Sequence, residues 1–132
     1  MSQSSFIRAV LVLPVSNMKV TTAWYENVLG LETIYLHNDP VEDPDGNYAI
    51  LRRDGAEIHL ILDEPPRMHP WSTAGTGYLF LLVKDIDAVF DQVKISGVEI
   101  TREISKEDWG ARAFLLTDPS GNLIRVAEEM TS

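Results

Sequence analysis

Apolar and polar positions follow the same order of periodicities in the two halves of the chain. A continuous apolar run predicts a buried strand, apolar positions three and four residues apart predict a helix, and further short apolar runs predict strands. In the first half the pattern predicts a strand buried on both faces at 6–15, a helix at 18–29 and a strand at 31–37. A polar loop at 38–47 and two more strands at 48–53 and 57–62 follow. In the second half it predicts a strand at 78–83, a helix at 86–96 and three more strands at 98–102, 111–116 and 123–128.

The two halves match at a nearly constant offset. The glycines that end the two predicted helices, Gly30 and Gly97, lie 67 positions apart, and His59 and Arg125 occupy matching last strands 66 positions apart. Such self-similarity indicates an internal duplication. We therefore expect an α+β fold of two tandem βαβββ modules that enclose a cleft. The domain organisation is expected to be 1-132 as a single domain, with modules at about 6-62 and 78-129 and a linker at 63-77.

Composition narrows the class of partner. The 132 residues include no cysteine, which excludes disulfides and thiolate chemistry and fits a cytoplasmic protein. The formal charge of −9 argues against a nucleic-acid partner, because phosphate binding needs a basic face. No apolar run is long enough to span a membrane, so no membrane partner is expected.

Three stretches resemble a known superfamily. "AWYENVLGLE" over 23–32 resembles a pattern of that superfamily in which an aromatic pair is followed by "LG" and a strand. "WGARAFLLTDPSGNLIRVAEE" over 109–129 resembles the C-terminal pattern of the superfamily, in which "WG", an apolar strand and a "DP-x-GN" turn follow one another. "VLPVSNM" over 12–18 matches the opening of one branch of the superfamily. These segments are similar to the vicinal oxygen chelate superfamily, which includes glyoxalase I, extradiol dioxygenases and fosfomycin-resistance enzymes. The bleomycin-resistance branch is the most similar, and the resemblance implies the glyoxalase/bleomycin resistance/dioxygenase fold.

The resemblance also implies where a metal would bind. Enzymes of this superfamily hold a divalent cation with His, Glu or Gln from four strand positions, and here those positions fall at Val10, His59, Tyr78 and Arg125. Valine has no donor, neutral tyrosine is a poor ligand, and arginine stays protonated. We therefore expect no metal, no cofactor and no catalytic residue. His59 alone is also typical of a hydrogen-bonded core residue, and Arg125 is expected to point inward rather than into solvent.

Aromatic and polar residues at strand ends and in loops suggest a ligand site. Trp109 matches the "WG" residue that, by resemblance, lines the drug groove of the bleomycin-resistance branch. Phe114 also suits core packing. The predicted loop over 38–47 carries four acidic residues, which either form a solvated surface or attract a cationic ligand. They are Asp39, Glu42, Asp43 and Asp45. The candidate ligand-binding residues are Tyr35, Tyr48, His59, Trp71, Tyr78, Trp109, Phe114 and Arg125.

Together these features predict non-catalytic binding and sequestration of a small molecule, as in drug resistance. The ligand is expected to be planar and cationic, and the protein to be a homodimer. Two alternatives stay open at this point. One is a metal-dependent lyase, isomerase or dioxygenase of the glyoxalase type with atypical ligands, and the other is an interaction module with a vestigial cleft.

Overall fold

The computed structural model describes residues 4–64 and 73–130. The first module contains β1 (Leu11–Val15), α1 (Met18–Leu29), β2 (Glu32–Asp39), β3 (Asp43–Arg53) and β4 (Ala56–Leu62). The second contains β5 (Tyr78–Val83), α2 (Ile86–Ile95), β6 (Arg102–Lys106), β7 (Arg112–Thr117) and β8 (Leu123–Glu128). Each module forms one four-stranded sheet, in the orders β1-β4-β3-β2 and β5-β8-β7-β6. The two orders are equivalent, which confirms the predicted α+β fold of two tandem βαβββ modules.

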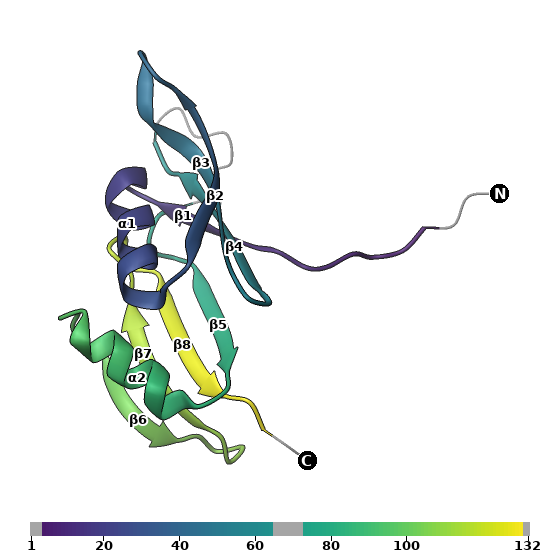
Figure 1. The fold of residues 1–132 in the computed structure, drawn as a ribbon, viewed down its shortest axis with the longest axis vertical. Helices are drawn as coiled ribbons and strands as arrows, with labels where there is room; N and C mark the ends of the chain where they lie inside the picture. Colours follow the sequence, from purple (N-terminus) through teal and green to yellow (C-terminus); the bar gives the residue numbers. More distant parts are fainter. Residues whose placement is uncertain (1–3, 65–72, 131–132) are drawn as a thin grey trace.

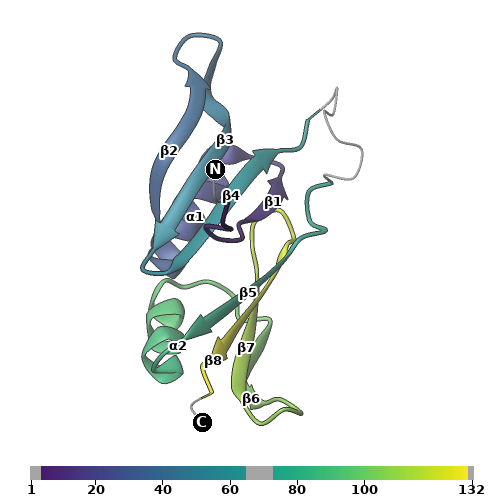
Figure 2. The ribbon, with the colours of Figure 1, turned by 90° about the vertical axis from the view of Figure 1, so that its right-hand side faces the viewer.

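Both helices lie on the same side of the molecule, and the two sheets follow one another along its long axis (Figure 1). In the view turned by 90°, α1 lies behind the strands of the first sheet and α2 lies to one side of β5 and β8 (Figure 2). Each sheet therefore has one face covered by its helix and one face without a helix, which we call the open face. Within one chain the two open faces do not face each other (Figures 1 and 2).

The helix-covered faces hold the core. Asn17 begins α1 by accepting a hydrogen bond from the Val20 backbone N–H at 3.0 Å, and Gly30 ends it in a left-handed conformation at φ 69°. In the second module Phe114 of β7 is fully buried and meets Phe90 of α2 edge-on, with ring centroids 5.1 Å apart. Phe114 therefore belongs to the core, and its prediction as a ligand-binding residue is corrected.

The turn between β7 and β8 joins the two modules. Asp118, which is buried, accepts a hydrogen bond from the Tyr25 hydroxyl of α1 at 2.8 Å. The side chain of buried Asn122 donates to the Pro14 carbonyl of β1 at 2.9 Å and accepts from the Gly77 N–H before β5 at 2.7 Å. Burial and the neighbouring carboxylate raise the pKa of Tyr25, so its hydroxyl stays protonated and keeps donating.

Three element predictions were wrong in extent. The first strand covers only β1, because residues 4–10 form an arm that leaves the body of the molecule (Figure 1) and has Phe6 and Ile7 fully exposed. Nor is β1 buried on both faces, since Val12 is exposed on the open face. The predicted loop at 38–47 is instead a hairpin, because the Asp39 carboxylate accepts from two N–H groups of its turn and lets β2 and β3 pair up to their ends.

The third error lies in the second module. The strand predicted at 98–102 is β6, and it runs from Arg102 to Lys106. Val98 and Ile100 pack against the core outside the strand, so their apolar character reflects burial rather than strand pairing.

Candidate functional site

Matching rows of side chains cross the two open faces. Residues paired across neighbouring strands project to the same face of a sheet. On the first open face the row through His59 consists of Val12, His59, Ile50 and Tyr35. On the second open face the equivalent row consists of Phe80, Arg125, Leu115 and Arg102. His59 and Arg125 therefore occupy equivalent positions in the duplicated fold, and both project onto open faces.

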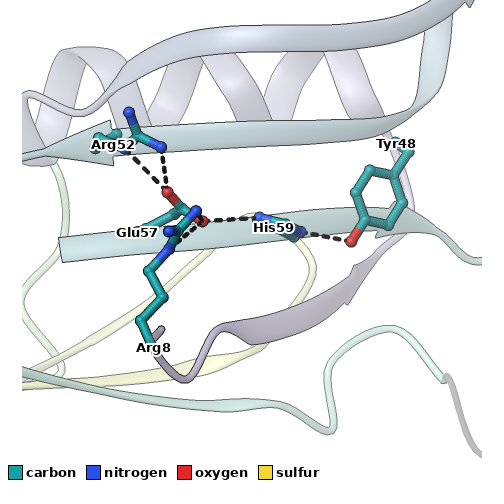
Figure 3. Close-up of polar contacts among 5 residues, drawn as sticks. All are labelled: Arg8, Tyr48, Arg52, Glu57 and His59. Carbon is teal, nitrogen blue, oxygen red and sulfur yellow. Dashed lines mark hydrogen bonds and ion pairs between the residues drawn. The ribbon is translucent and has the colours of Figure 1, made fainter. Parts of the chain in front are cut away.

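Hydrogen bonds hold the His59 ring on both sides (Figure 3). Its Nδ1 lies 2.6 Å from the Tyr48 hydroxyl, and its Nε2 lies 3.1 Å from Oε2 of Glu57. Burial raises the pKa of Tyr48, so this hydroxyl is protonated at neutral pH and donates to Nδ1. We therefore assign the His59 proton to Nε2, from which it is donated to Glu57. The histidine side chain is 17% exposed.

Glu57 is the charged centre of this group. It is 7% exposed and pairs with Arg52 at 2.5 Å and with Arg8 at 3.2 Å (Figure 3). Hydrogen bonds from Arg52, then from His59 and Arg8, lower the pKa of this carboxyl to about 2, against the effect of desolvation. The carboxylate thus stays ionised and orients the imidazole.

A second tyrosine–histidine pair lies on the same open face. The Tyr35 hydroxyl is 3.2 Å from Nδ1 of His37, and both side chains come from β2. Cross-strand pairing sets Tyr35 opposite Ile50, and His37 opposite Tyr48. The first open face thus combines two phenols and two imidazoles with apolar neighbours.

The second open face combines cations with an exposed aromatic ring. Arg125 is 21% exposed, pairs with Oε1 of Glu107 at 2.8 Å, and lies with its guanidinium carbon 5.8 Å from the centre of the Trp109 ring. Glu107 and Trp109 belong to the turn between β6 and β7, which closes through a 2.9 Å bond from the Gly110 N–H to the Glu107 carbonyl. Gly110 adopts φ 101°, a conformation that side chains disfavour, so the glycine permits the turn that carries Trp109.

The residues at these positions do not fit a divalent metal. The first-strand positions were predicted at Val10 and Tyr78, but cross-strand pairing instead sets Val12 and Phe80 beside His59 and Arg125. Neither Val12 nor Phe80 has a donor atom. Arg125 is a cation, and both nitrogens of His59 already have hydrogen-bond partners. Within the described ranges no group of three or more His, Cys, Asp or Glu residues is placed to hold a metal ion.

The structure brings together some predicted site residues and separates others. Tyr48 meets His59, and Trp109 meets Arg125, but the two pairs lie on different sheets. Tyr78 joins Val10 in the lining of a cavity of about 1050 Å³ between the modules. Trp71 lies outside the described residues.

The acidic residues predicted in the loop over 38–47 do not lie beside His59 or Arg125 on the open faces. Asp39 and Asp43 accept hydrogen bonds from backbone N–H groups at the end of the β2–β3 hairpin. In one chain this hairpin extends away from the second module (Figure 1). The carboxylates on the two open faces are instead Glu57 and Glu107, and neither was among the predicted site residues.

Arginine–glutamate spacing was the signal for these carboxylates. Arg52 and Glu57 face each other across the β3–β4 hairpin, and Arg102 and Glu107 are likewise five residues apart, at the second open face. The two pairs share this spacing but not their place in the repeat, because the first spans the β3–β4 hairpin and the second spans β6 and the turn that follows it.

Comparisons with known proteins agree with the fold. The family model described as Glyoxalase/Bleomycin resistance protein/Dioxygenase superfamily matches residues 8–126, and the chain belongs to this superfamily. No match was found among curated protein sequences.

Solved structures with the same fold include several members of this group. TioX from Micromonospora sp. ML1 is 19% identical with a TM-score of 0.77, covering 92% of this chain and 97% of TioX. A bleomycin-binding protein complexed with bleomycin is 21% identical with a TM-score of 0.71, covering 95% of this chain and 100% of that chain. A superfamily member from Sphaerobacter thermophilus DSM 20745 is 26% identical with a TM-score of 0.68, covering 93% and 98%.

The two helices were also compared with the requirements of a membrane span. Within the described part of the chain, neither combines the length and apolar character that crossing a bilayer demands.

Proposed function

We propose that the protein binds a small planar molecule and sequesters it without chemical change, as a drug-resistance protein of the cytoplasm would. The observation that carries this proposal is the second open face, where half-exposed Trp109 lies beside Arg125. Arg125 occupies a position at which metal-dependent relatives would need a residue that coordinates the metal. An exposed tryptophan offers a flat stacking surface, whereas the guanidinium cannot hold a metal. The similar fold of a protein solved with bleomycin supports ligand binding at this fold.

A homodimer is part of the proposal. One chain leaves both open faces uncovered, and they do not face each other (Figure 2), so it does not by itself enclose a cleft between them. Exposed apolar residues accompany these faces and the arm, and they are Phe6, Ile7, Val12, Tyr78, Phe80 and Leu82. A second copy, related by a two-fold axis, would set the first open face of one chain against the second open face of the other. The resulting cleft has His59 and Tyr48 on one wall and Trp109 and Arg125 on the other.

A thermal-shift series tests the binding role. We expect bleomycin or another planar drug to raise the melting temperature, since a ligand at 100 times its Kd stabilises the folded state by about 2.7 kcal/mol. Trp109→Ala should abolish the shift because it removes the stacking surface, and Trp109→Phe should retain part of it because it keeps an aromatic ring. A shift that is unchanged in Trp109→Ala would remove Trp109 from the site.

A further inference from the structure

Two arginines surround one carboxylate on the second open face. Arg102 and Arg125 lie on either side of Leu115 in the same cross-strand row. Oε1 of Glu107 accepts a hydrogen bond from Nη2 of Arg102 and pairs with Nη1 of Arg125 at 2.8 Å. One negative charge therefore balances only one of the two positive charges, and the group carries a net charge of one positive unit.

The same two arginines also have donors to spare. The Nε atoms of Arg102 and Arg125 are buried and have no hydrogen-bond partner among the described residues. A guanidinium has five N–H groups and no acceptor, and a buried N–H without an acceptor is unfavourable. The arrangement thus has an excess both of positive charge and of N–H donors, and a second oxyanion would balance the charge.

Aromatic surface adjoins this positive group. Trp109 is 48% exposed beside Arg125, and Phe80 is 43% exposed and is the β5 partner of Arg125 in the same row. Two further charges nearby in the chain, Lys106 at the end of β6 and Asp108 in the turn, are exposed and have opposite sign. A ligand whose flat ring lies against these aromatic side chains would therefore be close to the Arg125 guanidinium.

We propose that the second open face binds an aromatic compound bearing a carboxylate or a similar oxyanion. The ring stacks on Trp109, and the oxyanion accepts hydrogen bonds from Arg125 and Arg102. Charge-assisted bonds from guanidinium to a planar oxyanion are among the strongest and most directional in proteins. This inference rests on the proposed binding function and replaces the cationic ligand expected from the acidic loop, because those acids lie at the β2–β3 hairpin.

Three probes with one ring system test the charge preference. Naphthalene-2-carboxylate, naphthalene-2-carboxamide and naphthalen-2-ylmethylammonium share the ring and differ in charge at the substituent. We expect calorimetric titration of the full-length protein to show the carboxylate binding about tenfold or more tighter than the other two, since hydrogen bonds to charged groups are the stronger ones.

Paired arginine variants assign the preference to the site. Arg125→Met should remove most of the advantage of the carboxylate over the carboxamide, because the carboxylate loses a charge-assisted partner, and Arg102→Met provides a second, independent variant. Arg112→Met is the matched control, because Arg112 pairs with Asp87 and Glu128 away from the Trp109 ring. Circular dichroism establishes that each variant is folded before titration.

The outcomes separate this inference from the proposed function. Equal or tighter binding of the ammonium probe, or an Arg112→Met effect as large as that of Arg125→Met, would overturn the oxyanion site while leaving small-molecule binding intact. Failure of all three probes to bind would remove the aromatic site on which both proposals rest.

Discussion

Single residues on the two open faces are fixed by charge rather than by metal coordination. His59 is held between the Tyr48 hydroxyl and the Glu57 carboxylate, and Arg125 is held by Glu107. In each case a glutamate orients the residue that stands at the equivalent position of the duplicated fold. The side chains are therefore ordered before any ligand arrives, which reduces the entropy lost on binding.

The depressed pKa of Glu57 predicts an acid-sensitive contribution to stability. The folded-state pKa of about 2 lies below the ordinary glutamate pKa of 4.5, so the stabilising contribution is present above about pH 4.5 and is lost as the pH falls toward 2. Glu57→Gln should therefore flatten the fall in unfolding free energy over this range, as measured by urea denaturation at a series of pH values.

A surface carboxylate provides the control for that measurement. Glu103 is exposed on β6, and Glu103→Gln removes the same charge from the chain without touching the His59 group. Equal flattening in Glu57→Gln and Glu103→Gln would show that general charge repulsion, not the Glu57 ion pairs, sets the acid sensitivity.

At the scale of elements, the β7–β8 turn determines how the modules are joined. Asn122→Ala would leave the Pro14 carbonyl and the Gly77 N–H without the partner that links β1 to the start of β5. Since an unsatisfied buried polar group costs about 1–3 kcal/mol, we expect a loss of about 2–4 kcal/mol in unfolding free energy by urea denaturation.

Asn38→Ala is the matched control, because the Asn38 amide also donates to a carbonyl, that of Pro44, but is exposed. A loss of about 0.5 kcal/mol or less is expected there. Similar losses in the two variants would contradict the linking role of Asn122.

Elements with strong periodicity could be predicted from sequence, and those shaped by distant contacts could not. The order of elements and the equivalence of His59 and Arg125 followed from the repeat, because a duplicated pattern of burial produces a duplicated fold. The arm before β1 was misassigned as strand because its apolar residues satisfy the pattern while lacking a neighbouring strand in the same chain. The end of the hairpin at Asp39 was missed because the acidic residues and prolines of 38–47 are typical of a loop, and the sequence pattern does not show that the two strands pair there.

The candidate site was predicted only in part for a related reason. Trp109 and Arg125 followed from the resemblance, and the structure brings them together. Glu107 and Arg102 depend on how side chains meet across a sheet, which a one-dimensional pattern does not contain. Phe114 was assigned to the site because alternation predicts two faces but does not say which of them a helix covers.

At the scale of the whole molecule, the two open faces are the basis of the proposed second copy. Two sheets that lie end to end, with both helices on one side (Figure 1), leave their opposite faces uncovered. The net charge of −9 gives no general attraction for an anionic ligand, so recognition of an oxyanion has to come from the arginines themselves. A cleft between copies would lower the local dielectric around them and strengthen that recognition.

Cross-linking between copies tests most directly whether a second chain completes the binding site. The sequence has no cysteine, so Ile50→Cys on the first open face and Leu115→Cys on the second introduce single reactive thiols. When chains carrying one or the other are mixed and treated with a short bismaleimide, we expect a product of twice the 14.8 kDa chain mass, in higher yield than from either chain alone. A yield no higher than that from chains with Asp91→Cys on α2 would contradict a cleft formed between two copies.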